Sequence, residues 1–132
     1  MTEQRRLITE IIQNTDSHMT AEQIYNLAKA QMPCIAIGTV YRNLGLMERD
    51  GEIVRIAIPN APDRYDRNVQ FHEHMLCRKC GVLEDVWLGN LLEVINAMTQ
   101  TKIDSYELAM FGVCQSCQES AAAAEETQFN LK

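Results

Sequence analysis

Apolar residues in the first third of the chain recur at helical spacing, and polar breaks divide them into segments. The spacing predicts a helix over residues 3–14 whose apolar face is made of Leu7, Ile8, Ile11 and Ile12. Thr20 to Gln23 has the pattern of a capping box, which predicts that a second helix begins there. The inner face of this helix is expected to hold Ile24, Leu27 and Ala28. It should end at Met32, since Pro33 pushes the residue before it out of the α region.

A third helical segment runs to Asp50 and Gly51, where glycine readily takes the left-handed conformation that ends a helix. Its expected inward positions are Ile37, Val40, Tyr41, Leu44 and Met47. Its expected outward positions are Gly38, Thr39, Arg42 and Asn43, with Tyr41 at the edge. Residues 52–58 are rich in β-branched side chains and predict a strand, and residues 64–66 are a candidate return strand.

Three short helices followed by a β-hairpin is the order of a winged helix-turn-helix, whose third helix enters a major groove of DNA. The same order also occurs in three-helix units with a purely structural role. In the second half, the pattern predicts strands near residues 75–76, 82–87 and 103–113, with a helix over 88–98. The apolar stripe of that helix is expected in a core or at a dimer interface, and a short helix should extend from residue 118. The predicted class is α+β, with domains over residues 1–67 and 72–132 and a hinge over 68–71.

The composition is that of an ordinary globular protein, with 132 residues of which 46% are hydrophobic and 23% charged. No run approaches the ~20 apolar residues that span a bilayer, and the first ten residues lack an apolar signal core. We therefore expect a cytoplasmic protein without a membrane partner. The net charge of −6 argues against binding to nucleic acid, but residues 1–58 hold six basic and seven acidic side chains. The acidic excess therefore lies in the rest of the chain, which permits local DNA contacts without predicting them.

Five cysteines in such a chain point to metal or redox chemistry rather than to a disulfide framework. Four of them form two CxxC pairs, Cys77 with Cys80 and Cys114 with Cys117. Two such pairs can direct four thiolates at one tetrahedral centre, a closed site that suits Zn²⁺. The spacer of 33 residues requires a helix between the pairs. A redox dithiol is the alternative, although it needs only one pair. Cys34 stands apart and is expected to be a small buried residue.

Two of the three histidines, His72 and His74, share one face of a strand because they are two residues apart. That spacing lets both imidazoles reach one metal ion while Glu73 points away. Nitrogen and oxygen ligands suit Fe²⁺ or Mn²⁺ better than a thiolate cage does. Composition alone does not connect this pair to His18 or to any aspartate, because a lone histidine is more often a turn residue and scattered aspartates are usually solvated.

Four segments match a known pattern in order and spacing. They are residues 20–25 (TAEQIY), 38–44 (GTVYRNL), 71–81 (FHEHMLCRKCG) and 114–117 (CQSC). Over about residues 2–117, the chain resembles the ferric uptake regulator family of bacterial metal-dependent repressors. The resemblance implies an N-terminal winged-helix DNA-binding domain followed by a small α/β dimerisation domain. The two-fold symmetry of a homodimer then implies an inverted-repeat operator in double-stranded DNA.

The resemblance also implies roles for individual residues. Structural Zn²⁺ would bind Cys77, Cys80, Cys114 and Cys117. A regulatory Fe²⁺ or Mn²⁺ that bridges the two domains would bind His18, Asp66, His72, His74 and Asp85. Contacts in the major groove would come from Tyr41 and Arg42, beside the outward-facing Thr39. The chain starts where the family's second helix would, so Arg5 and Arg6 are expected to replace part of the leading helix's contact with the DNA backbone.

Within the family, the peroxide-sensing branch is the most similar, since Asp85 stands five residues after Cys80, where iron sensors usually have Glu. Glu84 leaves this open, because a shift of one residue would restore a Glu. The predicted function is a transcription repressor that senses peroxide through oxidation of an Fe²⁺-ligating histidine, His18 or His72. A repressor of metal-uptake genes that senses ferrous iron, manganese or zinc is the alternative.

Two further classes of function also stay open on the sequence. A metal-dependent enzyme could use the set of three histidines and two aspartates, but no nucleophile motif or phosphate loop accompanies it. A bare zinc-ribbon interaction module would leave that set of residues without a role.

Overall fold

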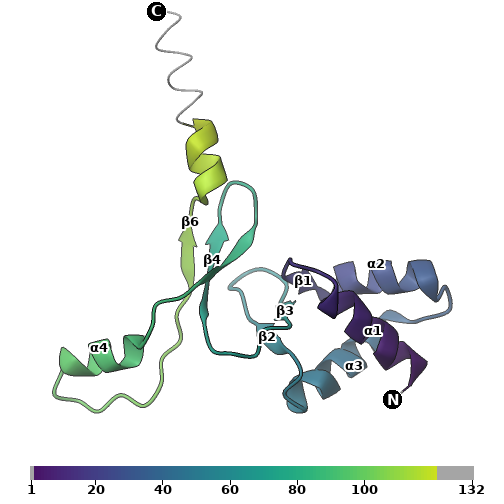
Figure 1. The fold of residues 1–132 in the computed structure, drawn as a ribbon, viewed down its shortest axis with the longest axis horizontal. Helices are drawn as coiled ribbons and strands as arrows, with labels where there is room; N and C mark the ends of the chain where they lie inside the picture. The colour runs from purple at the N-terminus through teal and green to yellow at the C-terminus, as the bar shows by residue number, and fades with distance from the viewer. Residues whose placement is uncertain (1, 122–132) are drawn as a thin grey trace, which may run out of the picture. The chain divides into compact units, whose positions relative to one another are not determined.

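The computed structural model describes residues 2–121, and the chain divides into two compact units, Met1–Phe71 and His72–Lys132. The first unit contains helices α1 to α3 and a small sheet, and the second contains another sheet and helix α4 (Figure 1). Residues 115–121 are helical, and the rest of the helix expected from residue 118 lies outside the described residues. Over residues 2–121, no helix combines the length and apolar character needed to cross a membrane.

The first unit opens with helices whose ends carry the expected caps. They are α1 (Glu3–Gln13), α2 (Ala21–Gln31) and α3 (Ile37–Arg49), with the short strand β1 (Met19–Thr20) before α2. The predicted capping box is present: the Gln23 backbone N–H donates to the Thr20 hydroxyl (3.1 Å), and the Thr20 N–H donates to the Gln23 amide oxygen (2.9 Å). Gly51 follows α3 with a φ of +76°, the left-handed conformation predicted to end that helix.

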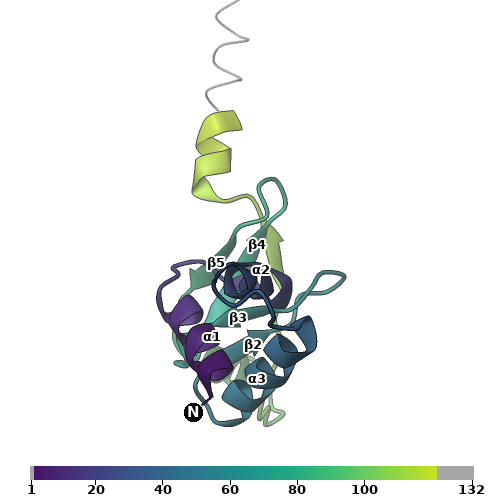
Figure 2. The same ribbon diagram turned by 90° about the vertical axis from the view of Figure 1, so that its right-hand side faces the viewer.

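The core of the first unit lies between its helices, which face the viewer in Figure 2. Its least exposed large side chains are Ile8, Ile12, Ile24, Val40, Leu44 and Met47. All four apolar residues predicted for the inner face of α1 are buried. This core fixes α3 against α1 and α2, and it leaves the opposite face of α3 open to solvent.

The structure corrects the predicted faces of α3. Ile37 and Tyr41 are 42% and 54% exposed, whereas Asn43 is buried. The buried residues of α3 are Val40, Asn43, Leu44 and Met47, which are three or four positions apart and so share one face of the helix. Asn43 is buried because of its position on that face, although its side chain is polar. The Asn43 side chain tolerates burial because its Nδ2 donates to the Thr39 carbonyl oxygen (2.8 Å).

Leu27 and Cys34 also lie outside the core, contrary to prediction. The buried row of α2 runs through Ala21, Ile24 and Ala28, and Leu27 lies at its margin with 50% of its surface exposed. Cys34 is exposed in the turn between α2 and α3. Ile35 fills the core from that turn instead.

A three-stranded sheet with the order β1-β3-β2 completes the winged helix. Its other strands are β2 (Val54–Ile56) and β3 (Arg64–Asp66). β3 is antiparallel to both neighbours, with Tyr65 opposite Met19 on one side and Arg55 on the other. The return strand is therefore confirmed, and the strand expected over residues 52–58 is shortened to three residues. β1 was not predicted, because two residues are too few to show a period.

The sheet of the second unit has the order β5-β4-β6. Its strands are β4 (Glu73–Cys77), β5 (Leu83–Val86) and β6 (Met110–Gly112). β5 is antiparallel to β4, and β6 is parallel to it. The strand predicted over residues 103–113 is thus reduced to its last part. The Asn96 side chain binds both backbone groups of Ile103 (2.7 and 3.0 Å), which removes the start of that segment from strand pairing.

Helix α4 (Leu91–Ala97) is shorter than the predicted helix over residues 88–98. Gly89 has a φ of +68°, and the Asn90 side chain accepts a hydrogen bond from the Glu93 N–H (3.2 Å), so the helix begins only at Leu91. Figure 1 shows α4 standing apart from β4 and β6. Every residue of α4 is at least partly exposed, and Met98 just after it is 83% exposed. The apolar stripe therefore does not form a core within the unit, and its place at a dimer interface stays a prediction.

We expect Leu44→Ala to lower the free energy of unfolding of the first unit by about 2–5 kcal/mol, because Leu44 is fully buried and its truncation leaves a cavity. Urea unfolding followed by circular dichroism measures the change. Leu27→Ala is the matched control, since the same atoms are removed from a half-exposed site. Equal losses in the two variants would contradict the packing described here.

Candidate metal centres

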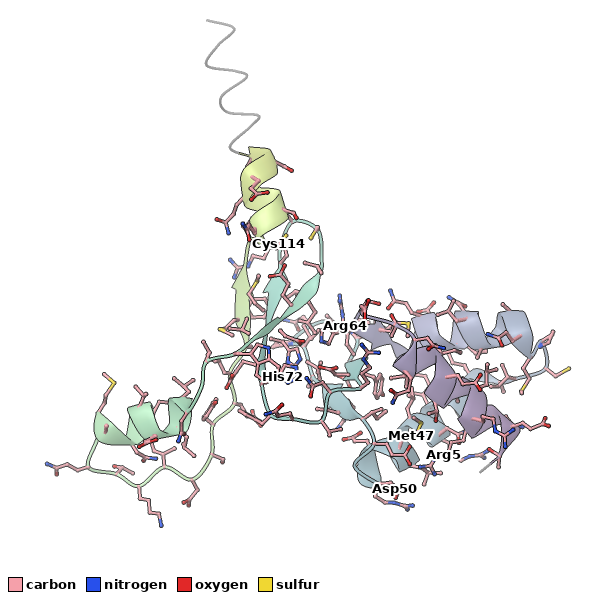
Figure 3. The ribbon with its side chains drawn as sticks, viewed as in Figure 1. Arg5, Met47, Asp50, Arg64, His72 and Cys114 are labelled. Atoms are coloured by element: carbon pink, nitrogen blue, oxygen red, sulfur yellow. The ribbon has the colours of Figure 1, made fainter. Side chains whose placement is uncertain are left out.

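The four paired cysteines come together at one end of the second sheet. Cys77 ends β4, and Cys80 follows it in a turn. Cys77 lies opposite Gly112 of the parallel strand β6, so the chain after β6 carries Cys114 and Cys117 to the same end. The four sulfur atoms all lie within 4.8 Å of one another. Cys114 is labelled in Figure 3.

The sulfur separations fit a tetrahedral zinc site. Cys77 Sγ lies 3.8 Å from Cys117 Sγ, and Cys80 Sγ lies 3.7 Å from Cys114 Sγ. Sulfur atoms at the corners of a tetrahedron around Zn²⁺, each about 2.3 Å from the metal, would be about 3.8 Å apart. The set has four soft donors and no position left for a substrate, which is typical of a structural rather than a catalytic site.

The electrostatics of the cluster also call for a cation. The backbone N–H groups of Cys114 and Cys80 donate to Cys77 Sγ (3.3 and 3.5 Å) and hold the pKa of Cys77 at about 6. The neighbouring Cys114 thiol, followed by burial, raises the pKa of Cys117 to about 12. Four sulfurs this close therefore cannot all ionise by themselves, and a divalent cation supplies the missing positive charge.

The second unit also carries a histidine and aspartate cluster near the start of β4. His74 lies directly opposite Asp85 of β5, and His72 lies on the same face because it is two residues earlier. Asp85 Oδ1 is 2.9 Å from His72 Nε2 and 3.3 Å from His74 Nε2. Three donor groups thus lie close together: one from β4, one from the residue just before β4, and one from β5. Figure 3 labels His72.

The acidic neighbours of these residues face the other way. Glu84 lies opposite Met75, one position out of step with the histidines. Glu73 is buried and accepts a hydrogen bond from the Tyr106 hydroxyl. In this register the carboxylate beside the histidines is Asp85 rather than Glu84, which removes the one-residue ambiguity of the sequence.

The first unit holds the other two predicted ligands. His18 Nε2 is 3.2 Å from Asp66 Oδ2, and each side chain is 9% exposed. The pairing of Met19 with Tyr65 brings the two together, since His18 precedes β1 and Asp66 ends β3. The other carboxylate oxygen of Asp66 accepts the Asn68 N–H (2.9 Å), which fixes the direction of the carboxylate.

Each unit therefore carries a preformed part of the predicted nitrogen and oxygen ligand set: two donors in the first unit and three in the second. Imidazole and carboxylate suit Fe²⁺ or Mn²⁺, and neither part alone fills the coordination sphere of such an ion. The joining of the two parts on one ion stays a prediction.

The outer face of α3 presents the predicted DNA contacts. Tyr41 and Arg42 are exposed, and Thr39 is partly exposed beside them. Arg6 is also exposed. The Arg5 guanidinium, in contrast, pairs with Asp50 (2.9 Å) and Glu52 (2.8 Å) and lowers the pKa of Asp50. Figure 3 labels Arg5 and Asp50. Since Arg5 is already neutralised by two carboxylates, it is poorly suited to the predicted contact with a phosphate.

The family model of the ferric uptake regulator family matches residues 1–111. The chain belongs to the ferric uptake regulator family. Members of this family are transcription regulators that bind metal ions and DNA, so the protein is a metal-responsive regulator. The α+β class with a winged helix is confirmed, as is the resemblance seen in the sequence. The family's cofactors, zinc together with iron or manganese, find their donor types here in the thiolate cluster and in the histidine and aspartate residues.

Relatives of the chain include two regulators that are named for their response to peroxide. It is 30% identical over 122 residues to the peroxide-responsive repressor PerR of Staphylococcus epidermidis, covering 90% of this chain and 81% of the relative. It is 32% identical over 120 residues to the peroxide operon regulator of Bacillus subtilis, covering 89% and 83%. Among solved structures, the ferric uptake regulator of Francisella tularensis with iron is 25% identical, with a TM-score of 0.73 and coverage of 89% of this chain and 93% of that one.

Reasoning from the sequence missed one aromatic residue at the histidine and aspartate cluster. Trp87 stacks on the His72 ring, with 4.6 Å between ring centroids and 23° between planes. The signal was present in the sequence, because Trp87 stands two residues after Asp85 and so shares its face of a strand.

We expect Cys77→Ser to lose the bound zinc and to unfold the second unit, because this sulfur is fully buried and accepts two N–H bonds in the cluster. Zinc per chain, measured after extensive dialysis, should fall from about one to near zero. Cys34→Ser is the control, since Cys34 is exposed and lies in the first unit. Retention of one zinc by Cys77→Ser would rule out the four-cysteine site.

Proposed function

We propose that the chain is a metal-dependent repressor in which one Fe²⁺ or Mn²⁺ is held jointly by the two units. The carrying observation is that each unit holds only part of a ligand set, already assembled: His18 with Asp66, and His72 and His74 with Asp85. If each group of residues had only a structural role in its own unit, the close approach of so many imidazole and carboxylate groups would have no explanation. Shared coordination gives all five residues one purpose.

The proposed mechanism is a shift between arrangements of the two units. When bound, the ion supplies a cross-link between donors of the two units. His18 and Asp66 tie this link to the winged helix through β1 and β3, while His72, His74 and Asp85 tie it to the sheet of the dimerisation unit. The ion shifts the protein towards the linked arrangement only to the extent that it binds more tightly to that arrangement than to the unlinked one. In a homodimer, the linked arrangement would set the spacing of two α3 helices.

The DNA target in this proposal is an inverted repeat, because a two-fold dimer presents its two α3 helices symmetrically. Thr39, Tyr41 and Arg42 lie on the face of α3 that would meet base edges and phosphates. Arg6 is exposed on α1 and is the better candidate for a contact with the backbone than Arg5, which is paired within the unit.

The signal we propose is peroxide. Support comes from Asp85, which stands where iron sensors usually have Glu, and from the two relatives that are named as peroxide regulators. With Fe²⁺ bound, one hydrogen peroxide would oxidise His18 or His72 by two electrons: one of its oxygen atoms would be added to the ring, and the other would leave as water. An oxidised imidazole is a poor ligand, so the two units would separate and repression would end. Iron sensing is the second candidate, favoured by the similarity to the iron-bound regulator of Francisella tularensis.

We expect His18→Ala and Asp85→Asn each to weaken Mn²⁺-dependent binding to operator DNA at least tenfold, since each removes a ligand from a different unit. Fluorescence anisotropy at a fixed, stated salt concentration measures the affinity. Asp104→Asn is the control, because this aspartate is exposed and remote from the histidines in sequence. If His18→Ala responds to Mn²⁺ like the parent, shared coordination by the two units is wrong.

The peroxide hypothesis has its own test. The Fe²⁺ form treated with dilute peroxide should gain one oxygen atom on the peptide that holds His18 or on the one that holds His72, and should release DNA. The Mn²⁺ form should bind DNA and resist the same treatment. Tandem mass spectrometry must assign the oxygen to a residue, because the tryptic peptides of His18 and His72 also contain Met19 and Met75. Fluorescence anisotropy follows the release of DNA. Oxidation confined to methionine or cysteine residues, with DNA still bound, would leave iron sensing as the function.

A further inference from the structure

Trp87 is an aromatic side chain that family membership and the ligand set leave without a role. It is 55% exposed, although it is the single tryptophan of the sequence and among its largest apolar groups. Its indole nevertheless makes one ordered contact, the stack on His72 with centroids 4.6 Å apart. A residue kept only for core packing would be buried, whereas this indole is ordered against a predicted ligand of the ion.

The register of β4 and β5 explains how the stack forms. Glu73 pairs with Val86 and His74 pairs with Asp85. Continued by one position beyond the two strands, this register brings His72 opposite Trp87, in agreement with the observed stack. Side chains two apart on a strand share a face, which puts both histidines, Asp85 and Trp87 on the same side of the sheet. The His72 ring thus has two aromatic neighbours, the stacked Trp87 ring and the His74 ring, which is 4.5 Å away and tilted by 53°.

The stack restricts the histidine side chain where orientation matters. An imidazole on a strand can rotate about two side-chain bonds, and its nitrogen reaches a metal ion in only one of the resulting positions. The indole face holds the plane of the ring while Nε2 stays directed at Asp85 Oδ1, 2.9 Å away. Coordination also draws electron density from an imidazole, and an electron-poor ring stacks more strongly on an electron-rich indole.

We propose that Trp87 is a positioning residue for the regulatory ion, acting through the stack that orients His72. The inference rests on the proposed function, since it assumes that His72 is a ligand. Trp87 itself offers no donor to the ion. Its contribution is a lower cost of ordering His72 and a stronger stack in the ion-bound state, and both raise the affinity for the ion.

The test is a titration of the zinc-loaded, full-length protein with Mn²⁺ alone. Trp87→Leu should bind Mn²⁺ roughly three- to tenfold more weakly than the parent, the range expected for the loss of one aromatic pair. Trp87→Phe should recover most of the affinity, since it restores a ring. Electron paramagnetic resonance of unbound Mn²⁺ gives the affinity without depending on DNA binding or on the fluorescence of the residue that is replaced.

Phe111→Leu is the matched control, because it also replaces a partly exposed aromatic residue of this unit but one that lies beside Arg78 rather than a histidine. It should bind Mn²⁺ like the parent, and all variants should keep their zinc and their thermal midpoint. In the parent, paramagnetic Mn²⁺ should also quench the Trp87 emission in proportion to occupancy.

The outcomes separate the two proposals. Unchanged Mn²⁺ affinity in Trp87→Leu, with normal binding by the parent, overturns the role of Trp87 and leaves the proposed function standing. Equal weakening in Trp87→Leu and Trp87→Phe also overturns it, because stacking would then not be the cause. Failure of the parent itself to bind Mn²⁺ beyond its zinc overturns the proposed function.

Discussion

The two-residue period of strand β4 is the constraint on which both candidate metal centres depend. Cys77 at one end of this strand contributes to the thiolate cluster, and His72 and His74 at the other end share a face with Asp85. A slip of one residue in the pairing with β5 would turn Glu84 towards the histidines and Asp85 away from them. The cysteine cluster opposes such a slip, because Cys80 in the turn between β4 and β5 belongs to it and its N–H donates to Cys77 Sγ at the end of β4.

The chemistry of the donors separates the two centres along that short strand. Thiolates and backbone N–H groups form a closed set that suits zinc, so this centre can hold the sheet together without taking part in sensing. Imidazoles and carboxylates form an open, incomplete set that suits Fe²⁺ or Mn²⁺. A regulator built this way can lose or exchange one ion while the fold of its second unit is held by the other.

In the winged helix, too, strand pairing brings two candidate ligands together. Antiparallel pairing of β1 with β3 brings His18 to Asp66 although 48 residues separate them in the chain. Asp66 also accepts the Asn68 N–H, so the carboxylate that faces His18 is joined to the segment that leads out of the unit. In the proposed mechanism, binding of the ion by Asp66 would therefore act directly on the start of the connecting segment.

The sequence by itself determined the class of the fold, the helices of the first unit, the two CxxC pairs and the histidine pair, because each is a local pattern of period or spacing. It could not determine which faces were buried: Asn43 lies inward and Tyr41 outward, against the prediction from polarity. Nor could it choose between Glu84 and Asp85, or show that Trp87, which shares a face with Asp85, lies against His72. Those outcomes depend on strand register and on packing between segments distant in the chain, and tertiary structure alone fixes both.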